Sequence, residues 1–92
     1  MAIKVEIFSA PGCTRCAQAR GPLKAVVDAL GADRVIWREV DVLAETDYAV
    51  ELGVVATPAV AIDGRLEFPA LPSPERLRAE LVRRLARDAG GA

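Results

Sequence analysis

Short apolar runs of strand length recur along the chain and alternate with longer stretches of helical spacing. Four runs predict strands, because they are rich in β-branched residues and are bounded by turn residues. They cover residues 3–8, 35–42, 59–62 and 65–68. Asp63-Gly64 separates the last two runs, and this dipeptide is a strong signal for a tight hairpin. We therefore expect the last two strands to be antiparallel.

Three further stretches predict helices. Apolar positions recur every three or four residues from Cys13 to Leu30, with Gly21-Pro22 inside the stretch. We expect this proline to kink the helix without ending it. A short helix is predicted over residues 45–52, and Ser73-Pro74 opens a last helix with serine as the N-cap.

The predicted order is βαβαββα in a single domain spanning residues 1–92. A helical crossover joins the first two strands, so these should be parallel, whereas the last two form the hairpin. The predicted fold class is therefore α/β, with a four-stranded mixed sheet flanked by helices. Trp37 falls on the second strand, which we expect to be an inner strand, and its ring should pack in the core.

Composition and charge narrow the classes of partner. The chain is 52% apolar with a net charge of −1, which gives no reason to expect nucleic acid or an anionic membrane surface as a partner. No apolar run approaches the roughly 20 residues that span a bilayer. The first residues enter a strand directly, without the pattern of a secretory leader. We expect a cytoplasmic monomer.

The candidate chemistry lies in Cys13-Thr14-Arg15-Cys16, between the first strand and the first helix. These are the only two cysteines, and the chain has no histidine, which excludes a Cys–His hydrolase mechanism. Cys13 at a helix N-terminus would face unpaired N–H groups that favour its thiolate, and Arg15 could add positive potential. Cys16, one turn inside, would act as the resolving thiol. This placement predicts reversible dithiol–disulfide exchange.

The sequence also allows other interpretations of the cysteine pair. The pair could be a structural disulfide or two buried thiols, although cytosolic pairs are more often redox-active or metal-binding. Small copper-carrying domains also place Cys-x-x-Cys after a first strand, but they end in a strand where this chain ends in a helix. A structural zinc site needs four ligands, so we expect neither a bound metal nor another cofactor. A redox sensor or partner-docking module without turnover is a further alternative.

Thr57-Pro58 immediately precedes the third strand. A proline is permitted at the first position of a strand, and only about 5–6% of X-Pro bonds are cis. In the predicted topology, however, this loop falls beside Cys13. A cis bond there would turn the backbone of Thr57 toward the sulfur, where it could pair with an extended substrate chain.

Together these segments resemble the thioredoxin-like superfamily over essentially the whole chain, and most of all the small redox-active disulfide proteins related to thioredoxin and glutaredoxin. The resemblance is carried by residues 11–16, 53–58, 62–64 and 71–73. It implies a thioredoxin fold and a protein-disulfide oxidoreductase, with Cys13 as nucleophile, Cys16 as resolving thiol and Pro58 as the cis-proline. The implied partners are a protein or small-thiol disulfide as substrate and a reductase or thiol as electron donor.

Two departures separate the chain from the main branches of that superfamily. Thioredoxins carry a buried aspartate six residues before the first cysteine, and this position is Ile7 here. Glu6 is one residue away and should face the other side of the sheet. Glutaredoxins have a Gly-Gly-x-Asp turn that grips glutathione, but residues 69–72 are Pro-Ala-Leu-Pro. The sequence therefore predicts no carboxylate at the thioredoxin position and argues against glutathione binding.

Overall fold

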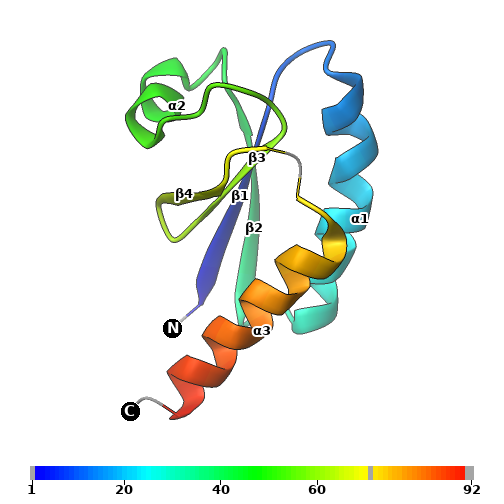
Figure 1. Ribbon diagram of the computed structural model, residues 1–92, viewed down its shortest axis with the longest axis vertical. Helices are drawn as coiled ribbons and strands as arrows, with labels where there is room; N and C mark the ends of the chain where they lie inside the picture. Colours follow the sequence, from blue (N-terminus) through cyan, green and yellow to red (C-terminus); the bar gives the residue numbers. More distant parts are fainter. Residues whose placement is uncertain (1, 71, 91–92) are drawn as a thin grey trace.

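The computed structural model describes residues 2–70 and 72–90, without the side chains of residues 88–90. Leu71, which belongs to the predicted entry to the last helix, lies outside the described residues. Secondary-structure elements follow one another in the predicted order (Figure 1). They are β1 (Ile3–Ser9), α1 (Thr14–Leu30), β2 (Val35–Asp41), α2 (Thr46–Leu52), β3 (Ala59–Ile62), β4 (Arg65–Phe68) and α3 (Pro74–Gly90).

The strands form one mixed sheet in the order β2-β1-β3-β4. β1 pairs with β2 in parallel and with β3 in antiparallel orientation, and β3 and β4 form an antiparallel hairpin. Asp63 and Gly64 both have positive φ angles, 52° and 80°, as a two-residue hairpin turn of this kind requires. The predicted mixed sheet and hairpin are confirmed.

The position of β2 differs from the prediction. We expected an inner strand, but β2 lies at the edge because β3 pairs with the opposite side of β1. The apolar pattern along β2 does not reveal on which side of β1 the third strand, β3, will pair. Trp37 is only partly buried on this edge strand, although it packs against the main core as expected.

The sheet buries apolar side chains on both faces. On one face α1 and α3 pack side by side (Figure 1) and cover a core that includes Val5, Ile7, Leu23 and Leu77. On the other face a smaller core, centred on Phe8, lies under α2. Successive residues of β1 therefore serve opposite faces, since side chains alternate along a strand.

α1 starts where the cysteine pair needs it. Cys13 is the N-cap, in an extended conformation, and its Sγ accepts a hydrogen bond from the backbone N–H of Cys16. The helix continues through Pro22 and ends at Leu30, and the C-cap Gly31 has a φ of 101°, which would be strained for a residue with a side chain. The local sequence thus places Cys13 at the N-terminus of the helix and Cys16 in its first turn.

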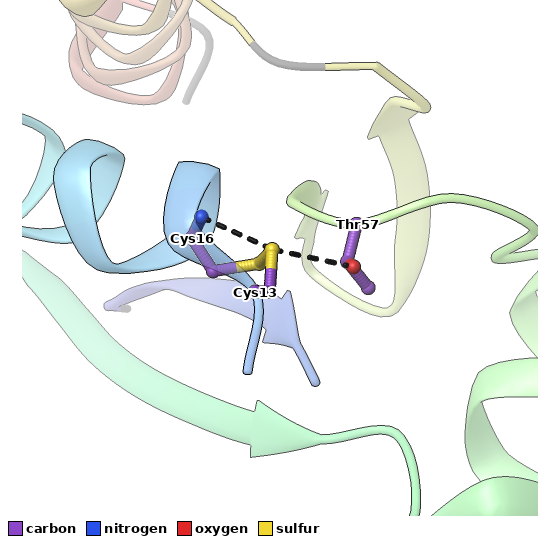
Figure 2. Close-up of a disulfide and its surroundings, with 3 residues drawn as sticks. All are labelled: Cys13, Cys16 and Thr57. Carbon is purple, nitrogen blue, oxygen red and sulfur yellow. Dashed lines mark hydrogen bonds between the residues drawn. A yellow bond between two sulfur atoms is a disulfide. The ribbon is translucent and has the colours of Figure 1, made fainter. Parts of the chain in front are cut away.

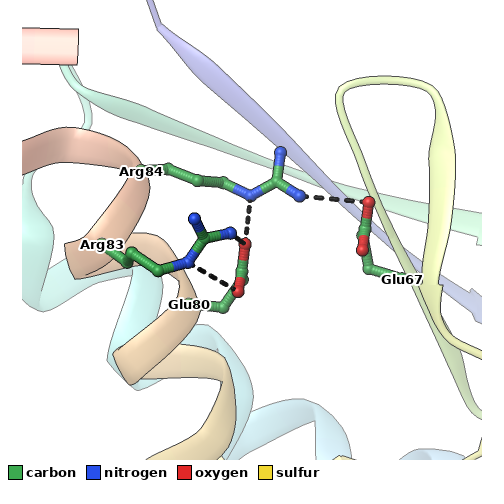
Figure 3. A network of polar contacts seen from close by, with 4 residues as sticks. All are labelled: Glu67, Glu80, Arg83 and Arg84. Atoms are coloured by element: carbon green, nitrogen blue, oxygen red, sulfur yellow. Dashed lines mark hydrogen bonds and ion pairs between the residues drawn. The ribbon is translucent and has the colours of Figure 1, made fainter. Parts of the chain in front are cut away.

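α3 is anchored to the hairpin by charged side chains (Figure 3). Ser73 caps the helix by accepting a hydrogen bond from the backbone N–H of Arg76 at 3.2 Å. Arg84 bridges Glu80 on its own helix and Glu67 on β4, at 2.6 and 3.1 Å. The neighbouring Arg83 guanidinium holds the pKa of Glu80 below its usual value. The network joins the last helix to the last strand, far from the cysteines along the chain.

Candidate active site

The two cysteines form a disulfide at the N-terminus of α1 (Figure 2). Their Cα atoms are 5.3 Å apart. Cys13 is partly exposed, whereas Cys16 is 4% exposed. The backbone N–H of Cys16 lies 3.1 Å from Cys13 Sγ. The pair therefore has one partly exposed cysteine at the positive end of a helix and one buried cysteine in the first turn.

The loop before β3 brings Thr57 and Pro58 to the disulfide. Phe8, at the end of β1, pairs with Ala59, at the start of β3, so the loop before β3 lies beside the loop after β1. The Thr57–Pro58 peptide bond is cis. Thr57 Oγ1 donates a hydrogen bond to Cys13 Sγ at 3.7 Å (Figure 2). The structure thus brings together two segments that are 44 residues apart in sequence.

An open cavity lies on the β2 side of the disulfide. Its volume is about 420 Å³, and both cysteines line it together with Ile7, Arg20 and Glu39. Glu39 lies on β2 opposite Ile7 of β1, so the two residues share one face of the sheet. Among the described residues that line this cavity, Glu39 alone has a carboxylate. The site therefore contains an acidic group that comes from the neighbouring strand.

Two neighbours hold the Glu39 carboxylate in place. Trp37 Nε1 donates to Glu39 Oε2 at 3.1 Å, and Arg20 Nη1 lies 3.4 Å from Glu39 Oε1. The side chain of Glu39 remains 42% exposed. Glu39 was not among the site residues predicted from the sequence. The available signal was its inward parity on the strand, two residues after Trp37 and four after Val35.

Arg15 lies apart from the cavity that contains the cysteines. It lines a separate, mostly apolar groove of about 340 Å³ between the start of α1 and residues 72–74. Arg20 is the arginine that shares the cavity with the disulfide. Electrostatic support of Cys13 by Arg15 stays a prediction.

Known proteins are similar to this chain over most of its length. A sequence model of the thioredoxin domain matches residues 1–81. The chain belongs to the thioredoxin family. A probable thioredoxin of Methanothermobacter thermautotrophicus is 31% identical over 77 residues, which are 84% of this chain and 89% of the relative. A thioredoxin of Methanocaldococcus jannaschii is 30% identical over 83 residues, or 90% of this chain and 96% of the relative.

Solved structures share the fold at lower identity. Thioredoxin-2, described as a component of the malaria parasite's protein secretion machinery, has a TM-score of 0.77 at 17% identity, covering 89% of this chain and 82% of its own. Malassezia sympodialis thioredoxin has a TM-score of 0.71 at 23% identity, covering 88% and 73%. The predicted thioredoxin fold is confirmed. Family membership and the Cys13–Cys16 disulfide together support a thioredoxin-like redox function.

This thioredoxin domain has a second polar cluster, on the opposite face of the sheet. Glu6 is fully buried there. Tyr48 Oη donates to Glu6 Oε1 and Arg38 Nη1 donates to Glu6 Oε2, each at 2.5 Å. Arg38 also bonds Glu45 at 2.6 Å. The prediction that Glu6 faces away from the cysteines is confirmed.

The cluster around Glu6 changes the ionisation of its partners. The hydrogen bond to Glu6, aided by burial, raises the pKa of Tyr48 to about 12. Hydrogen bonds to Glu45 and then to Glu6 raise the pKa of Arg38. Tyr48 also packs against Phe8, with ring centroids 5.8 Å apart, so it is a packing residue as well as a donor. The cluster therefore joins α2 to the sheet.

Among the described residues there is no group of three or more histidine, cysteine, aspartate or glutamate side chains arranged to hold a metal ion. No described helix combines the length and the apolar character needed to cross a bilayer.

Proposed function

We propose that this thioredoxin-family chain reduces or exchanges disulfides, with Cys13 as the attacking thiol and Cys16 as the resolving thiol. The observation that carries the proposal is the arrangement at the end of α1. Cys13, which is partly exposed, is bonded to a buried Cys16, and its Sγ contacts Thr57 of the cis-proline loop.

Cys13 is the better nucleophile because its surroundings favour a thiolate. A free thiol has a pKa of about 8.5 and is mostly protonated at neutral pH. The backbone N–H of Cys16 and the hydroxyl of Thr57 both point at Cys13 Sγ. The helix N-terminus adds a partial positive charge, and Arg15 in the same turn is proposed to add further positive potential.

The reaction moves two electrons from the dithiol to the substrate. The Cys13 thiolate attacks one sulfur of the substrate disulfide, the substrate S–S bond breaks, and the first substrate thiolate leaves. The Cys16 thiolate then attacks Cys13 Sγ, which forms the intramolecular disulfide and releases the second substrate thiolate. A dithiol donor or a reductase returns the pair to its reduced form.

The substrate is proposed to dock on the loop that carries Thr57 and Pro58. The backbone of Thr57 would pair with an extended segment beside the disulfide of a protein substrate. Val55, which is 92% exposed, offers an apolar contact two residues before Thr57. An open hollow of about 220 Å³ is lined by Thr57 and Val54 of this loop together with Val42. A small thiol disulfide would need only the sulfur contacts.

The proposed setting is the cytoplasm, with the protein acting as a monomer. Thiol pools there keep cysteine pairs reduced, so such a pair would be poised to give electrons to an oxidised substrate. The proposal requires neither a metal nor an organic cofactor.

Insulin reduction with dithiothreitol as donor tests the proposal. Wild type should accelerate turnover, whereas Cys13→Ser should match the donor alone. Cys16→Ser should form a mixed disulfide with the substrate that mass spectrometry detects, because the second thiol is missing. Equal rates for wild type and Cys13→Ser would refute the proposal. A single stoichiometric exchange without turnover would identify a redox sensor instead.

A further inference from the structure

The second step of the proposed reaction requires a proton to leave Cys16. Only a thiolate attacks a disulfide, and burial in apolar surroundings raises the pKa of a thiol. Cys16 is 4% exposed. While a substrate is attached to Cys13, the outer face of the pair is covered. The proton of Cys16 must therefore leave on the side of the cysteine pair that faces the protein.

Neither Ile7 nor Glu6 of β1 supplies a route for this proton. Ile7 lines the cavity beside the cysteines but has no group that accepts a proton. Glu6 belongs to the opposite face, where Tyr48 and Arg38 occupy its two oxygens. An acceptor must therefore come from another element that borders the cavity.

Glu39 satisfies the geometry of such an acceptor. It lies across from Ile7 on β2 and lines the same cavity as Cys16. The cavity, about 420 Å³, is large enough for several waters, each of which occupies roughly 30 Å³ in the liquid. Arg20 and Trp37 fix the two carboxylate oxygens at the wall. Arg20 and Glu39 are the two charged side chains among its described lining residues.

We propose that Glu39 accepts the proton of Cys16 through water in this cavity during release of the substrate. The Cys16 S–H bond breaks, its proton moves to the Glu39 carboxylate, and the sulfur keeps the electron pair. That pair forms the bond to Cys13 Sγ as the bond between Cys13 and the substrate breaks, and the substrate leaves as a thiolate. Reduction of the pair runs these steps in reverse.

The exposure of Glu39 completes the route. Its side chain is 42% exposed, so the proton passes from the carboxylate to bulk solvent. Arg20 and Trp37 act as positioning residues, because they hold the carboxylate against the cavity. The inference rests on the proposed roles of the two cysteines.

Two-phase kinetics with an aromatic disulfide test the inference. Reduced protein is mixed with one equivalent of dithiobisnitrobenzoate in a stopped-flow instrument. Attack by Cys13 releases the first coloured thiolate, and attack by Cys16 releases the second. In Glu39→Gln the second release should slow about tenfold or more near neutral pH, since general-base assistance typically contributes at least that much. The first release should stay within about twofold of wild type.

Matched variants separate proton transfer from a structural effect. Glu39→Asp keeps a carboxylate and should recover part of the second rate, and Glu51→Gln, exposed on α2, should leave both rates unchanged. The rates of wild type and Glu39→Gln should converge as the pH rises well above about 8.5, the ordinary pKa of a thiol, because the thiol proton is then lost without a base from the protein.

Two results would overturn the inference. One is an unchanged second release in Glu39→Gln across the neutral range, and the other is an equal slowing of both releases. The reagent replaces any physiological substrate, so the two phases are measured independently of insulin turnover. A protein inactive on insulin but slowed selectively by Glu39→Gln would refute the proposed function and keep the proton route.

Discussion

Each face of the sheet carries a glutamate, and the two have opposite surroundings. Glu6, on the face covered by α2, is fully buried, with its oxygens bonded to Tyr48 and Arg38. Glu39, on the face that carries the cysteines, is 42% exposed and lines an open cavity. Each is paired with an arginine, so charge pairing alone does not distinguish them.

The difference shows which surroundings make a carboxylate stabilise the fold and which allow it to exchange protons. The oxygens of Glu6 are saturated by donors in a closed space, so a proton could reach it only after the cluster opened. Glu39 lines the disulfide cavity and is also exposed to solvent. Protons can therefore reach and leave its carboxylate while the contacts with Arg20 and Trp37 persist. Glu6 should therefore determine stability, and Glu39 should determine the rate of disulfide chemistry.

Removal of the Glu6 side chain should give the largest change in stability. Glu6→Ala leaves the Tyr48 hydroxyl and one arm of Arg38 without their partner and creates a cavity, which should cost about 2–3 kcal/mol. This is below the cost for a fully buried pair because the Arg38 side chain is 42% exposed and can rehydrate. Urea unfolding measures the loss.

Glu6→Gln is the matched control for size, since its amide oxygen can still accept from Tyr48, whereas its NH₂ group removes the charge and the acceptor of Arg38. Its loss should be about half that of Glu6→Ala. If Glu6→Ala stayed folded but slowed the second thiolate release as Glu39→Gln should, the two faces would not be separate.

Tyr48 should make stability fall at alkaline pH. Its pKa is raised to about 12 in the folded protein, against about 10 in an unfolded chain. The folded state thus holds the proton more tightly, and the stabilisation is fully present below pH 10. It should be lost as pH rises from about 10 to about 12.

Tyr48 is the only tyrosine in the chain, so phenolate absorbance reports this group alone. Unfolding measured across the same pH range should show a smaller alkaline loss in Tyr48→Phe. At neutral pH that variant should be about 1.5 kcal/mol less stable, the usual value of a hydrogen bond to a charged group. An ordinary phenolate titration near pH 10 in folded protein would contradict the closed cluster.

Glu39→Gln should have the smallest effect on stability. Arg20 and Glu39 are 55% and 42% exposed, and such surface pairs contribute about 0–1 kcal/mol. The amide can still accept a hydrogen bond from Trp37, so we expect a loss below about 0.5 kcal/mol in urea unfolding. A loss as large as that of Glu6→Ala would mean that Glu39 is structural, and the comparison would fail.

Much of the site could be predicted from local sequence. Gly12 and Cys13 follow a strand and precede helical spacing, so the first cysteine had to lie at a helix end. Asp63-Gly64 fixed the hairpin by itself, because few other dipeptides favour positive φ at both turn positions. Thr57-Pro58 could be placed beside Cys13 only once the topology was inferred.

The role of Glu39 could not be predicted in the same way. Arg20 and Glu39 are 19 residues apart and meet only because α1 packs across β2. The register that sets Glu39 opposite Ile7, and the pairing of β3 on the far side of β1, both depend on contacts between distant segments. The sequence predicted no carboxylate at the position of Ile7. The structure places the carboxylate of Glu39, on the neighbouring strand β2, in the same cavity.

The sequence by itself determined the elements, the hairpin and the position of the cysteine pair at a helix N-terminus, because capping, turn residues and side-chain spacing act over a few residues. Tertiary structure alone decided that β2 is an edge strand, that Glu6 is buried with both oxygens bonded, and that Glu39 lines the disulfide cavity. Burial and cross-strand register determine the properties of a carboxylate, and both arise only when distant segments pack together.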